Sequence, residues 1–171
     1  MLYTVSRSGY MRIGLALLVA AILLSGCVTT LPGVMPVAVQ TTGDQEAANK
    51  EFILDYFAAL NEDKSPATVD AYMTDEVLKE HIAMFEASFP GYQLTAEEMI
   101  AEGDKIFVRT LFDAVHNGDL MGIAPTEKPV SIEIALIYQI QDGKIVDHWM
   151  LADLLTLMQQ IGAVPGPEAT E

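Results

Sequence analysis

Acidic and imidazole side chains gather near the end of the sequence, in the segment KIVDHWMLADLLTLMQQIG (residues 144–162). Asp147, His148 and Asp153 fall there within seven residues, around Trp149, the only tryptophan. Carboxylates and imidazoles can exchange protons near neutral pH when burial or nearby charges shift their pKa values. An aspartate base in an apolar cavity, with a histidine donor near a substrate carbonyl, could remove a neighbouring proton without a cofactor. The segment is therefore a candidate acid–base site, although it could equally be only the last strand and closing helix of a small domain.

Each of these residues has a structural alternative. Asp153 stands before the apolar run LLTLMQQIG, where aspartate is a favoured helix N-cap. An Asp153 that caps a helix and faces solvent would leave the enzymatic hypothesis without its base. Alternation along the strand places His148 and Met150 on one face and Asp147 and Trp149 on the other, and the sequence leaves open which face lines a pocket.

Four further polar side chains are candidates for lining a pocket. His116 ends a predicted strand beside a glycine-containing loop, so it lies either at a pocket rim or in solvent. His81 lies within an apolar helical stripe, where a buried core histidine is the alternative to ligand contact. Tyr138 has the pattern of a core residue whose hydroxyl could reach a cavity. Arg109 could pair with a buried acid or meet solvent.

Other kinds of chemistry find little support. The three histidines are dispersed and lack the spacing of metal ligands, so we expect no metal site. The sequence also has no glycine-rich loop of the kind that cradles phosphates.

The N-terminus has the pattern of an export signal. Arg7 and Arg12 precede a twelve-residue apolar run, residues 13–24, which ends in the small residues Ser25 and Gly26. A basic start, a short apolar stretch and small residues are typical of a secretory signal peptide. The run is shorter than the roughly 20 residues that a membrane-spanning helix needs.

The only cysteine follows this run directly. The motif Leu24-Ser25-Gly26-Cys27 resembles the lipobox of bacterial lipoproteins, whose cysteine is lipidated and becomes the mature N-terminus; a chance buried cysteine is the alternative. The resemblance implies a protein anchored to a membrane of the cell envelope, on its periplasmic side. Val28 is not the aspartate associated with inner-membrane retention, which favours the outer membrane.

Acidic residues greatly outnumber basic residues in this chain. The chain has a formal net charge of −15. Without residues 1–27, seven basic residues would face 24 acidic ones, a net charge of −17. Such a surface repels phosphate backbones, so we expect no nucleic-acid partner. Solubility at a crowded membrane surface is the simplest use of this acidity.

The rest of the chain divides into a tether, one domain and a tail. Residues 28–44 are rich in Pro, Gly and Thr and predict a flexible tether, residues 45–164 a domain, and residues 165–171 an acidic tail. Apolar spacing and turn residues predict three helices (from residue 45, over 66–73, and from 74–76 to 89), four strands (92–101, 105–116, 130–140 and 145–149) and a closing helix over 151–161. Helices followed by an antiparallel sheet indicate an α+β domain.

Three ordered segments resemble a known family. They are AEGDK (residues 101–105), HNGDLMGIAPT (residues 116–126) and YQIQDGKIVDHW (residues 138–149). Together they are similar to the SnoaL-like polyketide cyclases, or ester cyclases, of the NTF2-like superfamily. The resemblance covers residues 45–164. It implies a cone in which a curved antiparallel sheet wraps around N-terminal helices, with a closing C-terminal helix and an apolar pocket.

The same resemblance implies a chemistry. Characterised cyclases of the family close a polyketide ring by intramolecular aldol chemistry, without metal or organic cofactor, and an aspartate near the closing helix is the assigned acid–base group. Asp153 is the position that best matches it, with polar partners on the sheet. Two departures stand out: family members commonly have an aspartate directly after the tryptophan, where this chain has Met150, and their Pro-Pro-Thr-Gly loop reads APTE here (residues 124–127).

The sequence thus supports competing hypotheses. The first is a lipid-anchored enzyme that performs cofactor-free cyclase, isomerase or lyase chemistry on a small carbonyl compound, with Asp153 and His148 catalytic. Its expected substrate-binding residues are His116, Trp149, Tyr138, His81, Arg109 and Met150. The alternatives are a non-catalytic carrier of a small apolar ligand and a homodimeric interaction protein that uses its outer sheet face. Export argues against polyketide biosynthesis proper, because those intermediates are made in the cytoplasm.

Overall fold

The computed structural model describes residues 42–166 of the 171-residue chain. The predicted signal peptide, Cys27 and nearly all of the predicted tether lie outside the described residues, as do residues 167–171 of the predicted tail. Within the described part, no helix is long and apolar enough to cross a membrane.

Three helices come first, as predicted. They are α1 (Thr42–Glu62), α2 (Pro66–Tyr72) and α3 (Glu76–Ser88). Helix α2 begins at a proline, and the Ser65 side chain caps it by accepting from the backbone N–H of Thr68. Helix α1 already begins at Thr42, three residues before the predicted start of the domain.

Four strands form one antiparallel sheet in the order β1-β2-β3-β4. Their bounds are β1 Gln93–Glu102, β2 Lys105–Val115, β3 Pro129–Gln141 and β4 Lys144–Ala152. The β3–β4 hairpin turns at Asp142 and Gly143, with φ of 50° and 71°. Positive φ at both central residues matches the right-handed twist of the strands, which is why Asp-Gly is favoured there.

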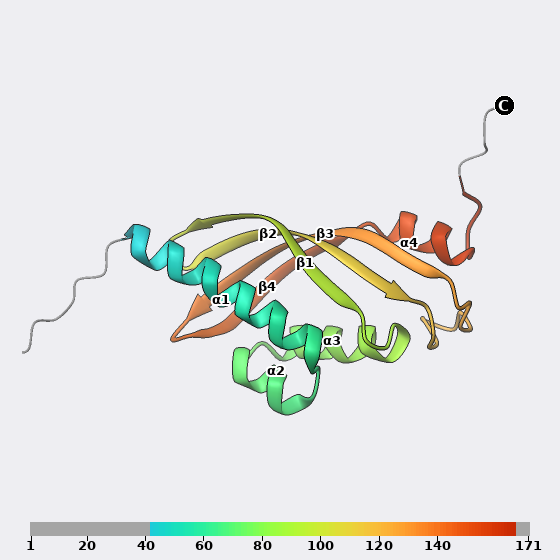
Figure 1. Cartoon of the computed structure of the whole chain (residues 1–171), viewed down its shortest axis with the longest axis horizontal. Helices are drawn as coiled ribbons and strands as arrows, with labels where there is room; N and C mark the ends of the chain where they lie inside the picture. Colours follow the sequence, from blue (N-terminus) through green and yellow to red (C-terminus); the bar gives the residue numbers. More distant parts are fainter. Residues whose placement is uncertain (1–41, 167–171) are drawn as a thin grey trace, which may run out of the picture. The chain divides into compact units, whose positions relative to one another are not determined.

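One face of the sheet is covered by helices, and the core lies between them (Figure 1). On β2, Ile106, Val108, Thr110 and Phe112 share one face of the strand and are all buried. They pack with the apolar face of α1, whose buried members are Ile53, Tyr56, Phe57 and Leu60. The α+β class and the curved, helix-covered sheet of the NTF2-like cone are thus confirmed.

The end of the sheet differs from the prediction. Strand β4 continues to Ala152, and α4 spans only Leu154–Ile161, where the sequence predicted a helix from residue 151. The long β3 supplies the reason, since Ala135 and Ile134 pair with Leu151 and Ala152. Tertiary pairing here overrides the helical propensity of the leucine-rich segment.

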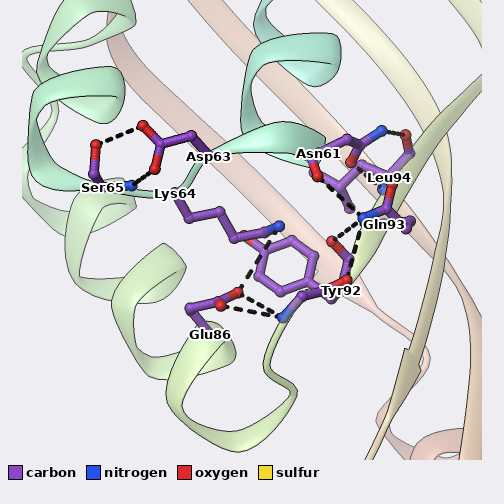
Figure 2. Close-up of polar contacts among 9 residues, drawn as sticks. Asn61, Asp63, Lys64, Ser65, Glu86, Tyr92, Gln93 and Leu94 are labelled. Carbon is purple, nitrogen blue, oxygen red and sulfur yellow. Dashed lines mark hydrogen bonds and ion pairs between the residues drawn. The ribbon is translucent and has the colours of Figure 1, made fainter.

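A polar junction fastens the start of β1 to the helices (Figure 2). The Asn61 side chain accepts from the backbone N–H of Leu94 at 2.8 Å and donates to the Leu94 carbonyl at 2.9 Å, as a neighbouring strand would. Lys64 Nζ lies 4.3 Å from the centre of the Tyr92 ring and 3.8 Å from Glu86. The junction therefore holds Tyr92 in place, and Tyr92 forms part of the wall of the cavity described next.

Candidate functional site

An aspartate and two histidines from distant parts of the sequence meet beneath the sheet. His148 Nδ1 lies 2.6 Å from Asp75 Oδ2, and His148 Nε2 lies 3.3 Å from His81 Nδ1. The two imidazole rings are 5.3 Å apart and nearly perpendicular, at 86°. The side chains of His148 and Asp75 are only 7% and 8% exposed. We call Asp75, His148 and His81 the relay.

Local structure fixes each member of the relay. Asp75 is the N-cap of α3, and its Oδ1 accepts from the backbone N–H groups of Val77 and Leu78, which leaves Oδ2 for His148. His81 belongs to α3 itself. His148 pairs with the buried Tyr138 on β3, so it lies on the face of β4 that meets the helices.

The protonation of the relay follows from Asp75. Burial by itself raises the pKa of Asp75, but hydrogen bonds from His148 and from the backbone of Leu78 and Val77 outweigh it, so the pKa of Asp75 lies below its usual value. Asp75 is therefore a carboxylate at neutral pH and can only accept, so His148 Nδ1 carries the proton of that bond. In neutral His148 the other nitrogen, Nε2, then accepts from His81 Nδ1–H, which leaves His81 Nε2 with a free lone pair.

A small apolar cavity adjoins His81. Its volume is about 40 Å³, room for a few water molecules at most. The lining side chains are almost all apolar or aromatic: Tyr56, Leu60, Leu78, His81, Ile82, Phe85, Tyr92, Leu94, Phe112, Ile134, Leu136, Tyr138 and Met150. Burial raises the pKa of the Tyr56 and Tyr138 hydroxyls well above the usual value, so both remain protonated donors at neutral pH.

A second, larger space also borders His81, and we call it the outer groove. Its volume is about 280 Å³. It is lined by His81, Met84, Phe85, Leu120, Met121, Met150, Leu151, Ala152, Leu154, Leu157 and Met158. His81, Phe85 and Met150 line both spaces, so these three side chains form the partition between the cavity and the outer groove.

Comparison with known proteins identifies the fold family. The family model described as SnoaL-like polyketide cyclase matches residues 38–161. The chain belongs to this family. No curated protein matches the chain.

Solved structures agree with this assignment. TsrD from Streptomyces laurentii is 26% identical, with a TM-score of 0.61 over 69% of this chain and 97% of its own. AclR from Streptomyces galilaeus is 24% identical, with a TM-score of 0.64 over 72% of this chain and 87% of its own. A protein from Jannaschia sp. CCS1, named as a SnoaL-like polyketide cyclase, is 21% identical, with a TM-score of 0.62 over 74% and 99% of the two chains. The last two likenesses concern the fold.

Within the SnoaL-like fold, several predicted residues do converge. His81, Tyr138 and Met150 line the cavity. His148 stands behind His81 and contacts it, rather than lining the cavity itself. The face of β4 that looks toward the helices is thus the one that carries His148 and Met150.

Asp153 does not join them, which corrects the expectation that it lines the pocket. It is the N-cap of α4 and is exposed: Oδ1 accepts from the Thr156 N–H at 3.0 Å and Oδ2 from the Thr156 hydroxyl at 2.7 Å. These bonds lower the pKa of Asp153, the opposite of what a buried base requires. The capping alternative therefore describes this residue.

Three further candidates also lie away from the cavity. Arg109 and Trp149 are on the outer face of the sheet, where Arg109 pairs with Glu133 at 2.9 Å and Trp149 is 52% exposed. His116 is fully buried, neither at a rim nor in solvent, and its Nδ1 lies 3.0 Å from Thr126 Oγ1. It packs against Phe89 rather than against the relay.

Asp75 is the site residue that sequence reasoning missed. Its place in Thr-Asp-Glu at the start of a helix predicts a cap, and capping occupies one of its two oxygens. The partner of the other oxygen lies 73 residues further along the chain, where no local pattern points to it. Among residues 42–166 there is no group of three or more His, Cys, Asp or Glu side chains arranged to hold a metal ion.

Proposed function

We propose that this SnoaL-like protein is a cofactor-free acid–base catalyst that removes a proton next to a carbonyl group, with His81 as the base. The observation that supports it is the relay, in which a buried carboxylate holds His148 and His148 in turn contacts His81 at the wall of an apolar cavity. Such orientation of an imidazole by a carboxylate is a recurring way to prepare a general base.

The proton has a defined route. A C–H proton next to the carbonyl moves to His81 Nε2 and leaves its electron pair in an enolate. His81 becomes an imidazolium, whose Nδ1–H faces His148 Nε2, and the Asp75 carboxylate stabilises the positive charge through His148. In a conjugated substrate, return of the proton from His81 to another carbon of the dienolate gives an isomer. When the enolate instead attacks a second carbonyl and closes a ring, His81 returns the proton to the alkoxide that forms.

The cavity can supply the second requirement, a donor to the enolate oxygen. Tyr138 and Tyr56 line it, and their raised pKa values keep both hydroxyls protonated. A neutral donor in apolar surroundings stabilises developing negative charge more strongly than the same donor in water. A substrate carbonyl placed between these hydroxyls and His81 would lie close to the donors and to the base at once.

Deuterium exchange tests this proposal without the natural substrate. In D2O, the wild-type protein should speed the exchange of the methylene protons of 2-butanone, measured by NMR. His81→Gln should lower the rate by about 100-fold or more, the usual contribution of a general base.

The Asp75→Asn variant tests the role of the relay directly. Asn caps a helix as well as Asp does, so α3 should remain folded. The amide N–H would face His148 Nδ1 and force the opposite tautomer, which places a proton on His81 Nε2; we expect at least a tenfold slower exchange. The matched control is Asp153→Asn, the same change at an exposed cap, which should leave the rate unchanged. A loss in Asp153→Asn, or equal rates in wild type and Asp75→Asn, would contradict the relay.

Binding without turnover is the second candidate. Met150 stands where family members commonly have an aspartate, Asp153 faces solvent, and the cavity is small and apolar. These features suit a carrier of a small apolar ligand. Wild-type protein that binds ketones but does not speed their exchange would favour this function over catalysis.

We also propose the setting of either function. The lipobox-like motif at residues 24–27 supports lipid anchoring through Cys27, and export then places the domain in the bacterial cell envelope, on the periplasmic side. The formal charge of −15 fits a soluble domain held near a membrane surface.

A further inference from the structure

We propose that the outer groove holds the body of an elongated, uncharged apolar ligand whose carbonyl end lies at His81 in the partition. The position of the carbonyl rests on the proposed function, whereas the apolar body rests on the groove alone. The ligand class is thus a long ketone or ester rather than a small carbonyl compound.

The volumes of the cavity and the outer groove are the first reason for this proposal. The cavity of about 40 Å³ admits only a terminal group, and the outer groove adds about 280 Å³. Ligand sites in proteins commonly measure about 300–1,000 Å³. Because His81, Phe85 and Met150 line both spaces, a molecule in the groove would have one end at the relay.

The chemistry of the lining is the second reason. Among residues 42–166, no Asp, Glu, Lys or Arg lines the groove, although the chain is strongly acidic. Four of its eleven lining residues are methionines, whose flexible side chains fill irregular spaces and adapt to apolar partners. Met121 and Leu154 are 84% and 54% exposed, so apolar surface is left open to water at the groove.

The loop beside the groove is held in a costly conformation. Met121 has φ of 52°, a left-handed value that a non-glycine residue adopts only when its surroundings impose it. The end of α3 fixes the loop: the backbone N–H of Gly118 donates to the Ser88 carbonyl, and Ser88 Oγ donates to the Asp119 carbonyl. A Cβ at Gly118 would lie 1.9 Å from the Ala87 carbonyl oxygen, so only glycine permits this approach. An exposed methionine is thereby fixed at the wall of the groove.

Displacement of a neutral fluorescent probe measures binding in the groove. N-phenyl-1-naphthylamine is bound to the wild-type protein and competed with 2-alkanones of four to twelve carbons. Each added methylene should strengthen binding by about fourfold until the groove is filled, after which the affinity should level off.

Leu154→Glu places a charge in the groove with little risk to the fold. Leu154 is the first residue of α4, where an acidic side chain is favourable to the helix. We expect at least tenfold weaker binding of 2-decanone to this variant. Leu155→Glu is the matched control, since Leu155 lies in the same turn, is 64% exposed and does not line the groove. Its affinity should equal that of the wild type.

The outcomes separate this proposal from the catalytic one. Loss of 2-decanone binding in Leu154→Glu but not in Leu155→Glu supports the groove, and the same loss supports it even if the wild type shows no exchange at all. Affinity that does not depend on chain length, or equal loss in Leu155→Glu, overturns it. A native mass spectrum in which a second copy excludes the probe overturns it as well.

Discussion

Asp75 serves two purposes because its two oxygens have different partners. Oδ1 caps α3, and Oδ2 faces His148 at 2.6 Å. A cap alone would tolerate several residue types, but the bond to His148 also needs a second acceptor, which the other carboxylate oxygen provides. The carboxylate thus couples the start of a helix to the chemistry of a strand residue.

The lowered pKa of Asp75 predicts a pH-dependent stability. A group whose pKa is lower in the folded than in the unfolded state stabilises the fold above its unfolded pKa, near 3.9, and this stability is lost as the pH falls through the folded value. At pH 7, Asp75→Asn should reduce the free energy of unfolding by about 1–3 kcal/mol. Urea unfolding of both proteins at pH 7 and near pH 3 would measure this difference, which should shrink at the lower pH.

Asp147→Asn is the control for this prediction. Asp147 is exposed on the outer face of β4, so its variant should stay within about 0.5 kcal/mol of the wild type at both pH values. A difference between wild type and Asp75→Asn that is the same at pH 7 and pH 3 would show that the Asp75 charge contributes nothing to folding.

On the outer face of the sheet, the pairing of the four strands aligns apolar side chains in one row. Ile100, Phe107, Ile137 and Trp149 are consecutive partners in the register across β1, β2, β3 and β4. Ile100 is 58% exposed, Ile137 37% and Trp149 52%. An uncharged row that crosses the whole sheet of an acidic protein is a surface on which a second copy could pack face to face with little charge repulsion.

We therefore predict a homodimer that depends on this row. Native mass spectrometry and sedimentation should show a dimer for the wild type and a monomer for Trp149→Glu, because the substitution places a charge at the centre of the apolar contact. Asp147→Ser, two residues away on the same face, should remain dimeric. A wild type that stays monomeric at about 100 μM would refute the interface without affecting the cavity.

At the scale of the whole molecule, the place in the cell that we propose for the domain rests on sequence motifs outside the described part. The proposed lipid at Cys27 would tie an acidic domain to a membrane that it has little other reason to approach. Such an anchor would keep the proposed site for apolar ligands beside a source of apolar molecules.

Fractionation of expressing bacterial cells tests the anchor. The full chain should appear in the membrane fraction, and Cys27→Ser should not, since no thiol would be left to accept a lipid. Ser25→Ala keeps a small residue within the motif and should behave as the wild type. Unchanged membrane association of Cys27→Ser would rule out lipid anchoring at this residue.

Local patterns in the sequence determined the elements and the family. The spacing of Ile53, Tyr56 and Leu60 predicted α1, because a helix repeats its buried face every three to four residues. The alternation along β2 and the Asp142–Gly143 turn predicted strands and a hairpin, because side-chain period and turn geometry are properties of neighbouring residues. The ordered segments at 101–105, 116–126 and 138–149 led to the family for the same reason.

Only the tertiary structure decided the site. Alternation gives a strand two faces, and packing chooses the one that is covered: His148 turned inward, while Trp149 and, on β2, Arg109 turned outward. Pairing with β3 lengthened β4 and left Asp153 to cap α4 in solvent. The relay joins residues 73 and 67 positions apart, and contacts over such distances are set by register and packing rather than by any local preference of the chain.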